Sequence, residues 1–407
     1  MADRLAFVID NGTDTFYDGP GKIESILPQP IRVKAKQVIG YFLAHGENKP
    51  DDVSSTLVWH LPQIANTSQL ILDGLTFTQD SPPKLVCSKD GFLTTVEQQM
   101  RISKIFEIHH DVDAKTGNIK TEGSILIHGD VTQGIEIVVG GDVEVRGLIE
   151  DVTIRANGSI VAKGGITGSN VGKLIAAGNI YCQFVQQANL EAMGSVLVDG
   201  SIINSNVLCG KKIVIRKRGL LVGGKTMSRD GIEAAQIGTE SAVPTEIEIG
   251  CNPFKRTHIE RIENEINNIE QSMKTIMVQV KHIEHELEGF VWLNSRDLAT
   301  SLFSAAEFLQ NEGDQLGDDK IYQTNKFGSG LMRLMRMTGE IEQLKEELKN
   351  ASSKESFTKN AKLVVAKIAH PGVIVKIQDS FIKLAMEYDR GLFYYKPEAR
   401  EVGFKYQ

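Results

Sequence analysis

The chain has 407 residues, enough for two or three domains, and its 41% hydrophobic content is ordinary for a globular protein. A formal net charge of −7 argues against a dedicated nucleic-acid-binding protein. No stretch approaches the roughly 18 uninterrupted apolar residues of a membrane-spanning helix, and the N-terminus lacks a secretory signal, so we expect a cytoplasmic protein that does not insert into membranes.

Residues 1–110 carry short runs of strand-forming residues that turn signals separate. Two of the runs are Ile31–Val33 and Lys84–Cys87, and Asp10-Asn-Gly and Ser81-Pro-Pro are among the breaks. Runs bounded by glycine, proline and asparagine predict strands. No repeat is visible here, so we predict a compact β-rich N-terminal domain.

A glycine-led strand start recurs through residues 111–253. The glycines lie 18, 17, 20, 16 and 16 residues apart, at Gly123, Gly141, Gly158, Gly178, Gly194 and Gly210. Short β-branched runs repeated in this way predict the coils of a parallel β-helix, each stacked on the one before. We expect the glycines to supply a positive φ at each corner, and the neighbouring Ser, Asp or Asn to bond the local backbone.

Two interior stacks follow from the alternation of side chains across a strand. The first is predicted to hold Ile125/Ile127, Val143/Val145, Ile160/Ala162, Ile180/Cys182, Val196/Val198 and Ile213/Ile215. The second is predicted to hold Ile137/Val139, Val152/Ile154, Ala188/Leu190 and Val207/Cys209. Cys182 and Cys209 are therefore expected to be buried and inert, and the four cysteines, which include Cys87 and Cys251, suggest neither a disulfide framework nor a zinc site.

The residue between each inward pair of the first stack should face outward. These positions hold Leu126, Glu144, Val161, Tyr181, Leu197 and Val214. Five of the six are apolar, and we call Leu126, Val161, Tyr181, Leu197 and Val214 the apolar column. Contiguous apolar surface marks an interaction site, so we predict that the apolar column is covered by the N-terminal domain or, as the second choice, by another copy in a homodimer.

Residues 254–353 change to a helical period. One heptad run consists of Ile259, Ile262, Ile266, Ile269, Met273, Ile276, Val280, Ile283 and Leu287, and a second of Leu334, Met337, Ile341, Leu344 and Leu348. Two such runs in one chain predict an antiparallel coiled-coil hairpin. From residue 354 the strand pattern returns, for example in Pro371-Gly-Val-Ile-Val-Lys-Ile, so residues 354–407 are predicted to rejoin the β-helix.

Three stretches in this order resemble the flagellar assembly protein A (FapA) family. They are Asp113-Ala-Lys-Thr-Gly-Asn-Ile leading into Gly123-Ser-Ile-Leu-Ile-His-Gly-Asp-Val, then Gly219-Leu-Leu-Val-Gly-Gly-Lys with Ala235-Gln-Ile-Gly and Thr245-Glu-Ile-Glu-Ile-Gly, and finally Ile368-Ala-His-Pro-Gly-Val-Ile-Val-Lys-Ile. The resemblance covers residues 110–407. The segment 129–147 also resembles the C-terminal β-helix of the septum-site protein MinC.

The family resemblance implies a right-handed parallel β-helix with an inserted coiled coil. It also implies a role in flagellar assembly or placement, protein partners in the flagellar or polar machinery, and recruitment to a cell pole. It brings no catalytic residues to this chain. The expected fold class is thus mainly β with an α-helical insertion, plus the N-terminal β-rich domain.

One segment satisfies a nucleotide-binding motif. Gly219-Leu-Leu-Val-Gly-Gly-Lys-Thr matches the phosphate-binding P-loop, which needs a strand before it and a helix after it. The Leu-Leu-Val positions look like a buried strand, and no amphipathic helix follows Thr226. We therefore expect a β-helix corner and no nucleotide binding.

Two further clusters carry side chains that could form a binding site. Lys211, Lys212, Arg216, Lys217 and Arg218 form a basic cluster, which we interpret as a solvated edge rather than a surface for an acidic partner or nucleic acid. His109-His110-Asp111-Val-Asp113 offers metal-capable side chains. Adjacent histidines in a strand point to opposite faces and a third spaced ligand is missing, so a solvated turn is expected.

These observations predict a non-enzymatic scaffold or regulatory protein that acts by protein–protein contacts. No catalytic, cofactor-binding or metal-ligating set is expected. The alternative is a carbohydrate-active or carbohydrate-binding β-helix protein, which would need three or more carboxylates and aromatics on one coil face. A nucleotide-dependent switch through Gly219–Thr226 is the third possibility.

Overall fold

The computed structural model describes residues 4–7, 31–43, 57–60, 71–81, 83–96, 99–217, 219–286, 307, 318–353, 357–358 and 360–407. The chain divides into two compact units. One unit comprises Met1–Gly250 with Thr358–Gln407, and its described elements are strands. The other is Cys251–Phe357, and its described elements are helices. The predicted fold class, a mainly β chain with an α-helical insertion, is confirmed.

The N-terminal strands form two small sheets. The first sheet contains β1 (Arg4–Phe7), β3 (Val38–Leu43), β4 (Leu57–His60), β6 (Leu75–Phe77) and β7 (Lys84–Cys87). The second contains β2 (Ile31–Val33), β5 (Ile71–Asp73), β8 (Gly91–Val96) and β9 (Gln99–Ser103). The predicted strands Ile31–Val33 and Lys84–Cys87 are therefore present as β2 and β7.

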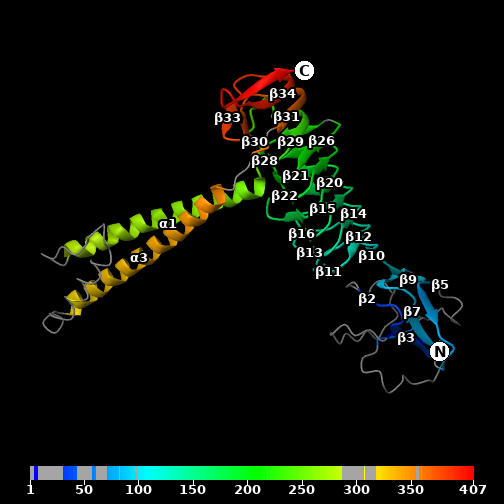
Figure 1. Cartoon of the computed structure of the whole chain (residues 1–407). Helices are drawn as coiled ribbons and strands as arrows, with labels where there is room; N and C mark the ends of the chain where they lie inside the picture. Colours follow the sequence, from blue (N-terminus) through cyan, green and yellow to red (C-terminus); the bar gives the residue numbers. More distant parts are fainter. Residues whose placement is uncertain are drawn as a thin grey trace. The chain divides into compact units, whose positions relative to one another are not determined.

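The middle of the chain is a parallel β-solenoid whose coils contribute strands to three columns (Figure 1). Column A contains β10 (Ile105–Ile108), β12 (Ser124–Ile127), β14 (Val143–Val145), β17 (Ile160–Ala162), β20 (Ile180–Cys182), β23 (Val196–Val198), β26 (Lys212–Ile215) and β29 (Gly231–Ile237). Column B contains the short strands β15 (Ile149–Glu150), β18 (Ile166–Thr167), β21 (Val185–Gln186), β24 (Ser201–Ile203) and β27 (Leu220–Val222). Column C contains β11 (Ile119–Thr121), β13 (Glu136–Val139), β16 (Thr153–Ala156), β19 (Lys173–Ala176), β22 (Asn189–Ala192), β25 (Asn206–Cys209), β28 (Gly224–Ser228) and β30 (Thr245–Ile249).

The interior of the solenoid is filled as the alternation predicts, with one correction. All residues of the first predicted stack are buried on column A. In column C, Ile137 is in register with Ile154 and Val139 with Ala156. Val152 and Ala188 are buried as expected, but neither shares the position of Ile137 or Val139. Each lies two residues before the residue in register with Ile137, which is Ile154 on one coil and Leu190 on another. Column B adds a third interior stack that the sequence pattern did not reveal, made of Ile149, Ile166, Val185, Ile202 and Leu221.

The reason why glycine recurs at these positions differs from the one that the sequence predicts. Positive φ angles are absent from the six repeat glycines, Gly123, Gly141, Gly158, Gly178, Gly194 and Gly210. A Cβ atom at Gly158 would lie 2.2 Å from Oδ1 of Asp142, and one at Gly210 would lie 2.3 Å from the carbonyl oxygen of Met193. Successive coils approach too closely at this corner for any side chain, so the repeat requires glycine for space rather than for backbone freedom.

The polar residues that follow Gly141, Gly158 and Gly178 link neighbouring coils. The backbone N–H of Ser159 donates to Oδ1 of Asp142 at 2.7 Å, and the N–H of Asn179 donates to Oγ of Ser159 at 3.1 Å. The N–H of Ser195 then donates to Oδ1 of Asn179 at 2.8 Å. These bonds form a polar ladder along one edge of column A, which satisfies backbone donors that the corner leaves free.

Left-handed backbone occurs at another corner, directly after the column B strands. Asp151, Gln187 and Asn204 have φ angles of 47°, 49° and 47°, and Gly223 occupies the equivalent place with 70°. The hydroxyl of Ser169 and the backbone N–H of Gly172 donate to the Asp151 carboxylate and lower the pKa of that group. Aspartate and asparagine tolerate this conformation because their side chains can bond the local backbone.

The C-terminal segment rejoins the solenoid and closes its end. Strand β31 (Lys362–Ala369) pairs in parallel with β29, and β32 (Val373–Ile377) pairs in parallel with β30. Three antiparallel strands follow, β33 (Ser380–Lys383), β34 (Tyr388–Lys396) and β35 (Glu401–Tyr406). The switch to antiparallel pairing ends the stack of coils, and β33 and β35 become the last strands of their sheets.

The helical unit is an antiparallel pair of long helices, α1 (Pro253–Glu286) and α3 (Asp318–Ser353), which lie side by side (Figure 1). Ile262 and Ile266 pack with Ile341, while Val280 packs with Phe327 and its neighbours on α3. This pairing of early α1 with late α3 is that of a hairpin within one chain. Among the described residues, no helix has an apolar stretch long enough to cross a membrane.

Candidate functional site

The apolar column lies on the outward side of column A, in the register that the sequence predicted. Val161, Tyr181, Leu197 and Val214 are in direct register on four successive strands. Glu144 separates them from Leu126. With strands about 4.8 Å apart, the uninterrupted part of the column extends roughly 14 Å along the solenoid. Tyr181 is 38% exposed and the other four members are half-buried.

Two different edges flank the apolar column. On one side runs the polar ladder of Asp142, Ser159, Asn179 and Ser195, and the amide of Asn179 also donates to the Tyr181 hydroxyl at 3.2 Å. On the other side, the residues that directly follow the column A strands include the exposed, positively charged Arg146, Lys163 and Arg216. The arrangement is a narrow apolar strip with one uncharged or acidic edge and one mainly basic edge.

Among the described residues, the apolar column keeps surface open to solvent, and Tyr181 is 38% exposed. Val161 and Leu197, the members of the apolar column next to Tyr181, are half-buried. In-register strands place equivalent side chains close together, so adjacent members of the column shield one another. Cover of the column by the N-terminal domain or by a second copy stays a prediction.

The outward positions of column A do not gather carboxylates. Glu107, Glu144 and Glu233 occupy these positions, but Leu126 lies between the first two and the rest of the apolar column between the last two. A glycoside-cleaving pair needs its two carboxyl groups within about 5–9.5 Å of each other across a sugar. The feature that would favour the carbohydrate alternative is therefore missing from this face of the described coils.

The P-loop match forms a β-solenoid corner, as predicted. The segment Gly219–Thr226 contains the end-to-end strands β27 and β28 rather than a strand followed by a helix. Gly223 and Gly224 both have positive φ, and Lys225 is on β28 in register with Glu246. Backbone N–H groups in a strand are used for pairing and do not converge on a phosphate as they do at a helix N-terminus.

We expect Lys225→Ala to change the free energy of unfolding by less than about 0.5 kcal/mol, because Lys225 is a half-buried residue of an ordinary strand. Thermal unfolding of the wild type and the variant, each with and without Mg-ATP, measures this. Mg-ATP should leave the melting temperature of both proteins unchanged. Saturable ATP binding that Lys225→Ala abolishes would contradict the assignment of this loop.

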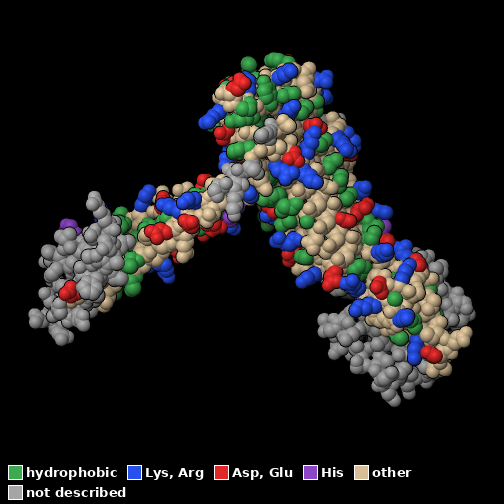
Figure 2. Space-filling model, viewed as in Figure 1, with side chains coloured by type: hydrophobic (Ala, Val, Ile, Leu, Met, Phe, Trp, Pro, Cys, Tyr) green, Lys and Arg blue, Asp and Glu red, His purple; other side chains and the backbone are tan. Residues whose placement is uncertain are grey.

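The described lysines of the basic cluster form ion pairs at the surface, and the cysteines are buried in the core. Lys212 pairs with Glu233 at 2.6 Å and Lys217 pairs with Asp199 at 3.0 Å, while Arg218 lies outside the described residues. Figure 2 shows positive and negative side chains interspersed along the solenoid. Cys209 is buried, and burial raises the pKa of its thiol to about 11, so no reactive thiolate forms there at neutral pH.

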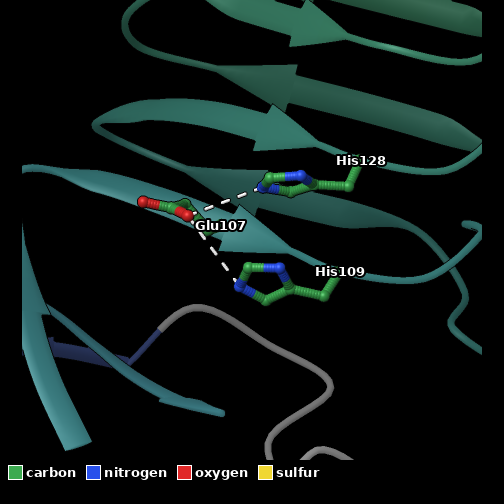
Figure 3. A group of neighbouring side chains, drawn as sticks. All are labelled: Glu107, His109 and His128. Atoms are coloured by element: carbon green, nitrogen blue, oxygen red, sulfur yellow. Dashed lines mark ion pairs between the residues drawn. The ribbon is translucent and has the colours of Figure 1, made fainter. Parts of the chain in front are cut away.

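A second cluster, which the sequence did not assign, lies at the first coils of the solenoid (Figure 3). Glu107 faces outward from β10, His109 follows β10, and His128 follows β12. Oε2 of Glu107 lies 3.8 Å from Nε2 of His109 and 3.5 Å from Nε2 of His128. The two imidazole rings stack with centroids 4.5 Å apart at an angle of 25°. The other carboxylate oxygen, Oε1, accepts a hydrogen bond of 2.7 Å from Nη2 of Arg101 on β9.

The Glu107–His109–His128 cluster was missed because its members come from different coils. The metal-capable neighbours of His109 along the chain, His110, Asp111 and Asp113, do not belong to this group. The Asp113 carboxylate accepts the backbone N–H groups of Thr116 and Lys115, which lower its pKa and make a local turn, as expected. A signal for the cluster is present in the sequence of the two coils. Ile108 is in register with Ile127, and each is followed by a histidine, so stacking places His109 beside His128.

Comparison with known families agrees with this architecture. The family model described as FapA, Flagellar Assembly Protein A beta solenoid domain, matches residues 104–402. No curated protein and no solved structure matches the chain. The family match covers most of the chain and includes the coils, the helical insertion and the segment that rejoins the solenoid. The chain therefore belongs to the flagellar assembly protein A family.

Proposed function

We propose that this protein is a non-enzymatic scaffold or regulator of flagellar assembly or placement. It acts in the cytoplasm, at a cell pole, by binding protein partners of the flagellar or polar machinery. Its membership of a flagellar assembly family supports a role in flagellar assembly or placement. A solenoid supports the scaffold role, because stacked coils hold surface side chains in a fixed, repeating order over a long distance.

The observation that carries the proposal is the apolar column. Val161, Tyr181, Leu197 and Val214 present apolar surface to solvent at a place where a solvated coil has polar residues. Covering apolar surface contributes about 2.5 kcal/mol for every 100 Å² or so removed from water. Tyrosine near the centre of a patch is the residue type on which binding energy concentrates.

The two edges of the apolar column indicate the chemistry of the partner. The exposed Arg146, Lys163 and Arg216 favour acidic residues along one side of the bound segment. The column is narrow, so a single amphipathic helix or strand matches it better than a broad globular face. Permanent complexes bury broad surfaces, whereas this column is a single row of side chains, which fits a transient contact during assembly.

The test is the double substitution Tyr181→Ser with Leu197→Ser. A matched control replaces Val171 and Met386 with serine, since these residues are 80% and 58% exposed on the same unit but outside the apolar column. Each version replaces the native gene in the source bacterium, and the number and position of flagella are counted. The column variant should assemble fewer or misplaced flagella, while the control behaves as the wild type.

Both variants should keep the wild-type circular dichroism spectrum, because all four positions face solvent at least in part. Normal flagella in a folded column variant would rule out the apolar column as the partner surface. Light scattering distinguishes the homodimer, in which the wild type has twice the mass of the column variant. A pull-down with a chain lacking residues 255–352 tests whether the helical hairpin provides a separate contact.

A further inference from the structure

We propose that Glu107, His109 and His128 form a binding site for a divalent transition-metal ion of the zinc class. This site is independent of the scaffold function and of the apolar column. It joins β10, the first strand of column A, to β12 on the next coil. It is therefore a cross-link at the N-terminal end of the solenoid.

The donor set is the first argument. Two imidazole nitrogens and one carboxylate oxygen are the ligands that open zinc sites use, with a fourth position left for water or another ligand. Magnesium and calcium instead require mostly oxygen ligands, which two histidines do not provide. The chemistry of Glu107, His109 and His128 thus selects zinc and the other nitrogen-binding divalent metals.

The distances are the second argument. Donor atoms around a tetrahedral zinc ion lie about 3.4 Å from one another, because each bond is about 2.0–2.1 Å. Oε2 of Glu107 lies 3.5 Å from Nε2 of His128 and 3.8 Å from Nε2 of His109, and all three donor atoms fall within 4.8 Å. The Glu–His separations are already close to those of a metal site. Coordination needs the two stacked rings to tilt so that their lone pairs converge.

An unsatisfied polar atom is the third argument. Nε2 of His128 is shielded from solvent and has no hydrogen-bond partner among the described residues. It faces Oε2 of Glu107, and the separation of 3.5 Å exceeds that of a good hydrogen bond. Buried polar atoms in native proteins nearly always have a partner, and a bound ion is one of the recognised explanations for an exception. A metal ion between Nε2 and Oε2 would satisfy both atoms.

The surroundings of the carboxylate provide the fourth argument. Arg101 donates to Oε1 of Glu107 at 2.7 Å, which fixes the carboxylate. Oε2 is left directed toward the two imidazole rings (Figure 3). Ligating carboxylates in metal sites are commonly held in this way by a hydrogen bond to the second oxygen. The positive charge of Arg101 also reduces the net negative charge of the site, so the expected affinity is micromolar rather than that of a structural zinc finger.

The experiment titrates ZnCl2 into the full chain after metal is stripped with EDTA, by isothermal titration calorimetry. The wild type should bind zinc, and His128→Gln and His109→Asn should each weaken that site by more than about 100-fold, because removing a ligand costs more than removing its support. His110→Asn is the matched control: His110 is the exposed neighbour of His109, and its Nδ1 contacts only the carbonyl oxygen of Asp111 within the described residues. The control should bind zinc as the wild type does.

Thermal unfolding provides a second measurement that does not depend on calorimetric stoichiometry. Zinc should raise the melting temperature of the wild type and of His110→Asn, but not that of Glu107→Gln, which keeps the shape of the side chain and loses its charge. Magnesium should have no effect on any of them. The site is refuted if the wild type shows no saturable zinc binding, or if both cluster histidine variants, folded by circular dichroism, bind zinc as tightly as the wild type.

Discussion

Replacing Gly210 with alanine is expected to lower the free energy of unfolding of the solenoid by about 3 kcal/mol, measured by urea denaturation. The added Cβ would lie 2.3 Å from the carbonyl oxygen of Met193 and 3.0 Å from its carbonyl carbon. Both are backbone atoms of the preceding coil, which is itself held by its neighbours on columns A and C. The clash can be relieved only by spreading the coils, which disrupts the hydrogen bonds between them.

The matched control for Gly210 is Gly134→Asn. Gly134 has a φ of 82°, and no atom lies within 4 Å of the place its Cβ would take. Asparagine adopts left-handed backbone at small cost, so this variant should lose less than about 1 kcal/mol. If both variants lost the same free energy, or if Gly210→Ala unfolded as the wild type does, crowding between coils would not be the reason for the repeat glycines.

Phe327→Ala should destabilise the helical hairpin by about 3–5 kcal/mol, the usual cost of removing a buried phenylalanine. Phe327 is fully buried between the two helices, in a cluster with Ile276, Val280 and Leu331. The hairpin is a unit separate from the solenoid, so its helices should melt at a lower temperature while the solenoid transition stays in place. Far-UV circular dichroism during heating reports the loss of helix. The resistance of the solenoid to protease, measured on the full chain, reports whether the solenoid stays folded.

Met332→Ala is the control on the same helix, because Met332 is 57% exposed. It should leave the helical transition within about 0.5 kcal/mol of the wild type. An unchanged helical transition in Phe327→Ala would mean that the two helices are not held together by this seam. A single transition that shifts for strands and helices together would mean that the two units unfold cooperatively.

Local patterns in the sequence determined most of the architecture. The glycine spacing predicted stacked coils, and the alternation of side chains placed Ile160, Tyr181 and Leu197 correctly as inward or outward residues. The heptad runs predicted two helices that pair within the chain. These features are readable because strand alternation and helical periodicity depend on neighbours a few residues apart.

Other features depended on contacts between coils, which the sequence pattern alone did not assign. Column B was not predicted, because a strand of two residues such as Ile149–Glu150 is too short to show an alternating pattern. The role of Gly158 was misread, since the crowding comes from Asp142 on the coil before it. Glu107, His109 and His128 come together only when the coils are stacked in register. The sequence determined the coil and its inward side chains, whereas the tertiary structure decided which side chains meet across coils, because stacking places residues nearly 20 positions apart within one strand spacing of each other.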